Sequence, residues 1–540
     1  MRSDRPQSAA ETPRELGAGV WIWFAVLVLV PLFVFRLPSE DEVETVSPEG
    51  MPATNSEPVV AHGKELARVV CATCHVFPPP DIATREQWAF EILPAKGKWL
   101  GVDPFDFEKH PGGEELKDSP VFPERASVSL VEWSAIRNYY LASASAIGGV
   151  RTEAVAKPEP WDGFDVQSIP ATQQPRNSVV AVDENLGVIY VGNENDSSVE
   201  VWSAEGKPIT SRAFHSAPSA ITVLPQALMI GVVGSRDLSD ETNGGLIRMS
   251  KPGGAGPPIQ VLDDRLRRPM DLAVADLNGD GREDHIVAER GGYLGLLSWM
   301  ENRDGSFQVH PLLERAGTRA VAVADMNGDQ RPDIVAVTSH GYEAIELFLN
   351  QPNGFEQKTI ARKHPRWRFS DVAVADANGD GRPDLITANG SVMTFQSDPA
   401  PLAADHGVSV WIADAQGGFT ERRVRSLAGA RRIVSADWDR DGDLDLAAIG
   451  YSNQPEALAN ESLVFLLNDG AMNFSAHTIE AAADAHWSDL AAGDLDKDGD
   501  TDLVLVASHP GNDRVPVDIL KRWMEKKTGM LILRNRVAVR

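Results

Sequence analysis

The only two cysteines of the 540-residue chain, Cys71 and Cys74, lie three residues apart and are followed directly by His75. Two thiols at this spacing are used by a covalently held haem, by a redox dithiol or by half of a zinc site, and a chance pair is the remaining alternative. The chain has no third cysteine to complete a zinc site of the Cys₄ or Cys₃His kind. A disulfide across so short a loop would do little to hold a domain together. The pattern therefore favours haem over a redox dithiol, which lacks its usual βαβ context in this sequence.

Apolar residues recur at helical spacing on both sides of this pattern. They lie at Val60, Leu66, Val69 and Val70 before it, and at Leu130, Trp133, Ile136, Tyr139 and Tyr140 after it. A helix, then C-x-x-C-H, then an aromatic-bearing helix resembles class I cytochrome c domains. The resemblance implies a small all-α domain over residues 59–145. In that family Cys71 and Cys74 would form thioether bonds to one haem c, and His75 would be the proximal iron ligand.

The second iron ligand is left open by the sequence. No methionine lies between Met51 and Met229. The segment FPPPDIATREQWAFEILPAKGKWLG resembles a subfamily of membrane-anchored monohaem cytochromes fused to repeat propellers, which carries a methionine where this chain has Lys96. Lys96 and His110 are the candidates within the domain, and water or a ligand from elsewhere is the alternative. Both residues can equally be solvated loop residues.

A second pattern occurs five times after residue 275, at intervals of roughly 50 to 60 residues. Each segment has oxygen-bearing side chains at its positions 1, 3, 5 and 9, which suits a hard cation of the size of Ca²⁺. The predicted ligands are Asp276, Asn278, Asp280 and Asp284; Asp325, Asn327, Asp329 and Asp333; Asp376, Asn378, Asp380 and Asp384; Asp437, Asp439, Asp441 and Asp445; and Asp494, Asp496, Asp498 and Asp502.

These segments differ from EF-hands, which need flanking helices and a glutamate at position 12. Position 12 is Val287, Ala336, Thr387, Ala448 or Leu505, and the flanking residues have the character of strands. Strands, a calcium loop and about 50 residues per unit resemble the FG-GAP (or VCBS) repeats of integrin-like β-propellers. Two further units, 178–206 and 219–250, lack the ligands. The resemblance implies a large all-β, seven-bladed propeller over residues 176–540, stabilised by up to five Ca²⁺ ions.

Each of the seven units also carries Arg or His just before its first strand, on an otherwise acidic chain. Our hypothesis is a central basic funnel that receives an anion: a carboxylated glycan, an acidic patch of a partner or the propionates of the haem. Pairing of these arginines with carboxylates of neighbouring blades is the alternative. The residues proposed for the funnel are Arg268, Arg319, Arg368 and Arg432, with Trp367 and Trp487 at its rim.

Composition and the N-terminal region suggest a location. The formal net charge of −27 argues against nucleic acid as a partner. Residues 16–35 form an uncharged apolar run long enough to span a membrane, which predicts an uncleaved signal anchor after a cytoplasmic tail, residues 1–15. The positive-inside rule then predicts a single-pass protein of the bacterial inner membrane, with its bulk in the periplasm or outside. Residues 36–58 and 146–175 are expected to be linkers.

The predicted fold class is therefore a transmembrane helix, a small all-α cytochrome c domain and a large all-β propeller. We expect a membrane-tethered electron carrier whose propeller docks a redox partner or an anionic ligand. The alternatives are a haem-coupled oxidoreductase acting on a substrate at the propeller, and an adhesion or glycan-binding module. The propeller sequence has no clear catalytic base, so whether the protein is an enzyme is left open.

Overall fold

The structure is a computed structural model, and it describes residues 57–145, 156–235, 239–251, 257–390, 405–451, 458, 460–509 and 515–537. Every described residue belongs to one compact unit, Thr54–Arg540. The predicted tail 1–15, the predicted span 16–35 and most of the predicted linker 36–58 lie outside the described residues.

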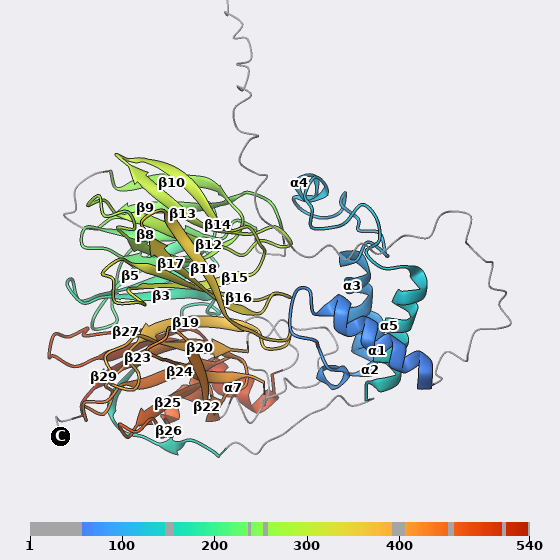
Figure 1. Cartoon of the computed structure of the whole chain (residues 1–540). Coiled ribbons are helices and arrows are strands. Elements are labelled where there is room, and N and C mark those ends of the chain that lie inside the picture. Colours follow the sequence, from blue (N-terminus) through green and yellow to red (C-terminus); the bar gives the residue numbers. More distant parts are fainter. Residues whose placement is uncertain are drawn as a thin grey trace, which may run out of the picture. The chain divides into compact units, whose positions relative to one another are not determined.

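Seven antiparallel sheets follow one another along the chain, and each is one blade of a β-propeller (Figure 1). Blades one to three hold β3 (Asn177–Asp183), β4 (Val188–Asn193), β5 (Ser198–Ser203) and β6 (Pro208–Ala213); β7 (Pro218–Val223), β8 (Ala227–Val232), β9 (Gly244–Ser250) and β10 (Ile259–Leu266); and β11 (Pro269–Ala275), β12 (Asp284–Glu289), β13 (Leu296–Arg303) and β14 (Ser306–Leu313). Blades four and five hold β15 (Thr318–Ala324), β16 (Asp333–Thr338), β17 (Ala344–Gln351) and β18 (Gly354–Arg362); and β19 (Phe369–Ala375), β20 (Asp384–Asn389), β21 (Gly407–Ala413) and β22 (Phe419–Ser426).

The last two blades borrow strands from the segment that precedes the ring. Blade six holds β23 (Ala430–Ala436), β24 (Asp445–Gly450), β25 (Leu463–Asn468) and β26 (Phe474–Thr478), and the short β1 (Glu159–Pro160) pairs with β26. Blade seven holds β27 (Trp487–Gly493), β28 (Asp502–Ala507) and β29 (Thr528–Asn535), and β2 (Phe164–Pro170) is its outer strand, antiparallel to β29. The range 146–175, expected to be a linker, therefore contains the strand that closes the ring. The predicted seven-bladed propeller is confirmed.

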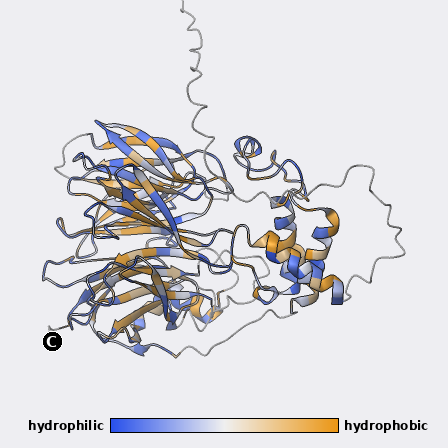
Figure 2. Cartoon of the chain, viewed as in Figure 1, coloured by the Kyte–Doolittle hydropathy of each residue, from blue (hydrophilic) through white to orange (hydrophobic). Residues whose placement is uncertain are grey.

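The hydrophobic core lies within the blades and between neighbouring blades. The second strand of blades two to seven is buried along its whole length. Leu297 of blade three packs in one cluster with Ile334 and Phe348 of blade four. Figure 2 shows hydrophobic residues concentrated in the strands and hydrophilic residues in the connecting loops. Such packing makes each blade depend on the next for its buried surface.

The first strand of every blade has a β-bulge at the same place. In all seven pairings of the first with the second strand, the register shifts between the first and third residues of the first strand. The second residue is left without a partner in the ladder, and a bulge of this kind re-aims its side chain. These seven residues are Ser178, Ser219, Met270, Arg319, Ser370, Arg431 and Ser488.

The segment 57–145 contains two helices longer than two turns, α1 (Glu57–Cys71) and α5 (Leu130–Ser143), which pack against each other. Gly63 permits this close approach, because a Cβ at that position would lie 2.1 Å from the carbonyl oxygen of Ala135. The other helices are α2 (Arg85–Gln87), α3 (Leu93–Trp99), α4 (Gly113–Lys117), a 3₁₀ turn (Pro80–Ile82) and a π-helical turn (Trp88–Ile92). In the propeller, α7 (Val517–Lys526) and a 3₁₀ turn (Glu480–Asp484) belong to blade seven and its approach.

The predicted fold class is wrong in its N-terminal parts. A small all-α cytochrome c domain over 59–145 is not supported, because helices there are few and short, and the chain between α1 and α5 contains only short helical segments separated by turns and bends. The three consecutive prolines 78–80 lack the N–H groups that a continuing helix needs, which accounts for part of this. The two predicted helices that flank the segment are present, although Leu130 is 72 % exposed rather than on the buried face.

The predicted transmembrane helix and the inner-membrane location are likewise corrected. In the part of the chain that is described, no helix is long and apolar enough to cross a membrane. The longest described helix, α1, has 15 residues and carries charged side chains such as Lys64 and Arg68. A membrane span needs about 20 predominantly apolar residues.

Candidate functional site

The cysteine–histidine segment begins where α1 ends, at Cys71. Both cysteines are free thiols; Cys71 is half-buried and Cys74 is exposed. The next residue, His75, is only 5 % exposed, and its Nδ1–H donates to the carbonyl oxygen of Val76 at 2.9 Å. Within the described residues, no hydrogen bond is made by the other ring nitrogen, Nε2. Burial, together with the nearby charge of Lys96, lowers the pKa of His75 to about 4, so the ring is neutral at pH 7.

An aromatic wall stands beside Cys71. Trp88 and Tyr140 are stacked with their ring centroids 3.9 Å apart, and both are almost completely buried. The Tyr140 hydroxyl donates to the carbonyl oxygen of Pro78 at 3.1 Å and lies 3.9 Å from Cys71 Sγ. Burial raises the pKa of both the Cys71 thiol and the Tyr140 phenol, so neither ionises near neutral pH. The segment is therefore held in place by an apolar pocket with satisfied polar groups.

Lys96 on α3 shares this pocket. Its surroundings lower the pKa of the ammonium group by desolvation, which outweighs the opposing effects of Cys74, Cys71 and Glu343. A Cβ placed on Gly341, between β16 and β17, would lie 3.8 Å from Lys96 Nζ. The structure thus places Lys96, one of the two ligand candidates, near the cysteines and His75.

His110 is engaged elsewhere. Its Nε2 and the carboxylate of Asp240 are 2.7 Å apart, and the Asp240 side chain is completely buried. The same carboxylate accepts hydrogen bonds from the backbone N–H groups of Gly292 and Leu294, each at 2.8 Å. No described contact joins His110 to the cysteine–histidine segment.

Loops of the propeller line the other side of Lys96 and His75. The backbone N–H of Val76 donates to the carbonyl oxygen of Lys363 at 3.3 Å, and Arg366 donates to the carbonyl oxygen of Ile82. His340 has a left-handed backbone, with φ of 70°, and its pKa falls to about 3 through desolvation and neighbouring cations. Those cations are Arg290, Lys96, Arg368 and Arg268.

Two buried charges of this region are strongly affected by desolvation. Burial raises the pKa of Glu343 to about 8, against the opposing effect of Arg368 and three backbone N–H groups. Burial lowers the pKa of Arg290 to about 10, and the charges of Arg268 and Arg368 act in the same direction. We refer to Arg268, Arg290 and Arg368 as the cationic cluster. The sequence analysis missed Arg290, His340 and Glu343, because they follow buried strands in loops without a recognisable motif.

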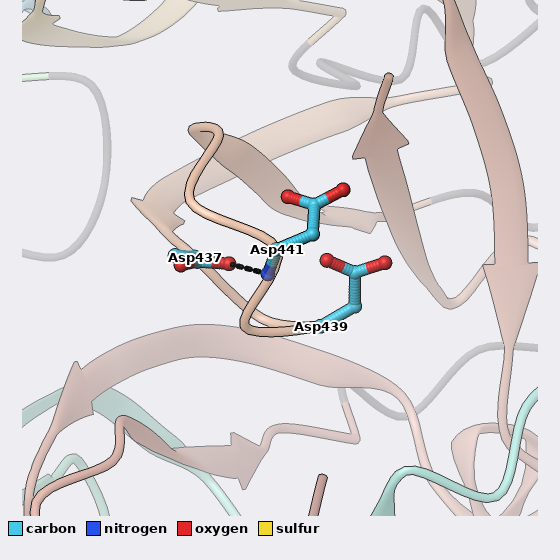
Figure 3. Close-up of side chains that lie close together, drawn as sticks. All are labelled: Asp437, Asp439 and Asp441. Atoms are coloured by element: carbon cyan, nitrogen blue, oxygen red, sulfur yellow. Dashed lines mark hydrogen bonds between the residues drawn. The ribbon is translucent and has the colours of Figure 1, made fainter. Parts of the chain in front are cut away.

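The five acidic loops join the first and second strands of blades three to seven. In each, the first Asp accepts backbone N–H groups of its own loop; Asp437 Oδ1, for example, accepts from Asp441 N at 3.1 Å (Figure 3). Carboxylate oxygens of Asp437, Asp439 and Asp441 lie within 4.8 Å of one another, as do those of Asp494, Asp496 and Asp502. These distances suit a shared cation.

The Asp at position 9 of each loop makes hydrogen bonds that hold the loop against its blade. Asp445 is fully buried, and its Oδ2 accepts from Trp438 N at 2.9 Å while its Oδ1 accepts from Asn468 N at 2.7 Å. It therefore ties the loop to the third strand of the same blade. The other four loops repeat this pair of hydrogen bonds through Asp284, Asp333, Asp384 and Asp502.

The loops differ at position 7, a difference that the sequence analysis did not use. In blades three to five this residue is an arginine that pairs with the Asp at position 5, as Arg331 does with Asp329 at 2.5 Å. In blades six and seven it is Asp443 or Asp500. The last two loops therefore have more carboxylates and lack the arginine that pairs with position 5 in the other three loops. Arg440 of the blade-six loop pairs instead with Asp500 of the blade-seven loop, at 3.3 Å.

The propeller axis holds a cavity of about 410 Å³ whose lining includes Arg268, Arg319 and Arg432 of the predicted funnel. The other predicted members lie outside this lining. Trp487 is completely buried and donates from Nε1 to the carbonyl oxygen of Ala482 at 2.7 Å. Trp367 packs at the edge of a blade core, and Arg368 belongs to the cationic cluster.

Comparison with known proteins agrees with the repeat architecture. The FG-GAP-like repeat family matches residues 276–336, 325–387 and 437–505, which contain all five acidic loops. No curated protein sequence matches the chain. Among solved structures, the Neurospora crassa Pan2 WD40 domain is 10 % identical, with a TM-score of 0.43 over 70 % of this chain and 97 % of that one. Kuenenia stuttgartiensis hydrazine synthase is 10 % identical, with a TM-score of 0.44 over 69 % and 99 %.

These findings define the propeller part of the molecule. The chain contains FG-GAP-like repeats within a seven-bladed propeller. A propeller of this kind is a module that binds a ligand or a partner.

Proposed function

We propose that the chain holds one covalent haem c at Cys71, Cys74 and His75 and carries electrons through it, while the propeller binds the partner or ligand. The observation that carries the proposal is the state of these three side chains. Both thiols are free, and the buried His75 uses Nδ1 for a backbone hydrogen bond while Nε2 makes none within the described residues. A histidine that ligates a metal is commonly oriented in this way by its other nitrogen.

The surrounding residues fit such a group. A bound haem supplies one-electron redox chemistry at its iron. Trp88 and Tyr140 would keep water from one edge of the pocket, since both are almost completely buried. Haem also carries two propionates, and the cationic cluster offers guanidinium groups to balance them on the side of the propeller loops.

Lys96 is the better placed of the two predicted second ligands. Its ammonium group lies among Cys71, Cys74 and His75, and desolvation favours the neutral amine that a metal ligand must be. His110 would first have to give up its contact of 2.7 Å with the buried Asp240. In this proposal Lys96 would be the second ligand of the iron.

The test is to produce the chain in cells that attach haem c and to measure its mass and its oxidised and reduced spectra. We expect a mass increase of one haem that survives denaturation, and its loss in the Cys71→Ala, Cys74→Ala double variant. Lys96→Met should change the spectrum of the oxidised protein. The matched control His110→Gln should leave that spectrum unchanged.

A colourless protein with both thiols open to alkylation would overturn the haem proposal. If haem is attached but the spectrum of Lys96→Met equals that of the wild type, the haem proposal stands and the assignment of Lys96 falls.

We further propose that Ca²⁺ ions occupy the acidic loops, up to five in all, and stabilise the blades. The clusters Asp437–Asp439–Asp441 and Asp494–Asp496–Asp502 support this, since oxygen atoms within 4.8 Å of one another suit one hard cation. Chelation with EGTA should lower the temperature of thermal unfolding, and Ca²⁺ should restore it where Na⁺ does not. Equal unfolding temperatures with EGTA and with Ca²⁺ would refute the proposal.

A further inference from the structure

The bulge residues of the seven blades form a ring of hydrogen bonds around the propeller axis. In four blades this residue is a serine whose hydroxyl donates to the first residue of the next blade. Ser178 donates to Pro218 O at 2.6 Å and Ser219 donates to Pro269 O at 2.6 Å. Ser370 reaches Ala430 O at 2.8 Å and Ser488 reaches Asn177 O at 2.6 Å. A serine at this position therefore fastens one blade to the next.

Two blades place an arginine where the others have this serine. Arg319 of blade four and Arg431 of blade six occupy the equivalent bulge position, and both line the axial cavity of about 410 Å³. Each gives up the blade-to-blade hydrogen bond and brings a charge toward the axis. The fold does not require an arginine at this position, because a serine serves at the same place in four other blades.

The guanidinium groups of these two arginines make no hydrogen bond or ion pair with the described residues. Arg431 only lies over the ring of Tyr451, 4.9 Å from its centroid. Arg319 is desolvated, which together with the charges of Arg431, Arg290 and Arg432 lowers its pKa to about 9. Cations brought this close without a carboxylate in direct contact gain strongly from a bound anion.

Two other arginines of the cavity lining, in contrast, form ion pairs with carboxylates. Arg432 pairs with Asp371 at 3.1 Å and with Asp489 at 3.0 Å. Arg176 pairs with Glu194 at 3.1 Å. The lining holds five arginines and two carboxylates, and one positive charge remains in excess when Asp271 and Asp371, just behind it, are counted.

We propose that the axial cavity binds a small oxyanion, with a carboxylate or phosphate group held between the guanidinium groups of Arg319 and Arg431. Guanidinium groups bind both kinds of group through paired N–H donors. A volume of about 410 Å³ admits a metabolite-sized molecule. This site is independent of the haem proposal, since it needs neither the cysteines nor His75.

The experiment uses substitutions that the fold itself suggests. Arg319→Ser and Arg431→Ser introduce the residue that four other blades carry, so the double variant is expected to fold. Citrate and inorganic phosphate are titrated into the purified full chain by calorimetry, against chloride at equal ionic strength. Arg212→Ser, which removes an exposed arginine of β6, is the control for a general loss of charge.

We expect at least one of the two probes to bind the wild type and the Arg212→Ser control equally. Each single axial variant should weaken binding about tenfold or more, which corresponds to the loss of one charge-assisted contact. Tighter binding of citrate than phosphate, or the reverse, identifies the class of the natural oxyanion. No binding of either probe above chloride, or equal affinity in wild type and the double axial variant, would overturn the proposal.

Discussion

Arg432 offers a quantitative test of how the propeller axis is held together. Its guanidinium bridges Asp371 and Asp489, whose side chains are each 6 % exposed. The far oxygens of these carboxylates accept backbone N–H groups of other blades, from Ile433 at 2.9 Å and from Val180 at 2.9 Å. Arg432 therefore neutralises two buried charges that connect four blades: Asp371 joins blades five and six, and Asp489 joins blades seven and one.

Replacing Arg432 with methionine keeps much of the volume and removes the charge. Breaking a buried ion pair by removing one partner costs about 3–5 kcal/mol. Because the Arg432 side chain is itself 32 % exposed, we expect the lower end, about 3 kcal/mol. Burial already raises the folded-state pKa of Asp371 to about 6 against the opposing effect of Arg432, and removing Arg432 raises this pKa further. Relative to the wild type, the variant should therefore be destabilised most above pH 7, and the difference in unfolding free energy should become smaller toward pH 5.

The assay is urea unfolding followed by tryptophan fluorescence, to which the fully buried Trp438 and Trp487 contribute. The variant should unfold at a lower urea concentration. Adding Asp371→Asn and Asp489→Asn should restore much of the loss, since asparagine accepts the same backbone hydrogen bonds without a charge. If Arg432→Met is as stable as the wild type at pH 8, our account of the axis is refuted.

Three further predictions follow from other parts of the structure. Glu289 is 4 % exposed, and burial raises its pKa to about 7. The free energy of unfolding should therefore fall by about 3 kcal/mol as the pH rises from 4.5 to 7, because the folded state loses a proton that burial favours. In urea unfolding, Glu289→Gln should not show this dependence on pH. Asp441→Asn, in a loop whose position 7 is Asp443 rather than an arginine, should lower the Ca²⁺-dependent part of the unfolding temperature more than Asp280→Asn, because Arg282 already pairs with Asp280. The reverse order in calorimetric scans would contradict this ranking of the loops. Gly63→Ala should cost about 1–3 kcal/mol, because its Cβ would meet the Ala135 carbonyl, and circular dichroism of the helices should report this loss.

The repeat architecture could be predicted because its pattern is local. The Asp and Gly residues of each loop lie within nine positions, so their spacing alone indicates the turn between two strands. The helices before Cys71 and after Ser129 were found for the same reason, since the apolar residues that form α1 and α5 recur at helical spacing. The predicted cytochrome fold failed because it depends on how the intervening chain packs, which the prolines at 78–80 and the short turns after them determine.

The axial site could be predicted only in part, because its partners are distant in sequence. Arg432 was expected to bind an anion, but it pairs with Asp371 and Asp489, which lie in other blades. Trp487 was expected at a rim and is instead in a blade core. Superposition of the seven bulge positions is needed to separate the two kinds of arginine. One kind replaces a serine that hydrogen-bonds to the next blade, and the other kind forms ion pairs within the propeller.

The pairing of β2 with β29 has a consequence for how the molecule is made. The strand that completes blade seven is translated before any other blade, yet its partner, Thr528–Asn535, is translated only after the strands of the other six blades. Until then the nascent chain carries an orphan edge at each end, a state open to strand exchange between neighbouring polypeptides. A chain that lacks β29 would consequently leave the propeller open between blades seven and one, and such a chain would be a substrate for chaperones or proteases.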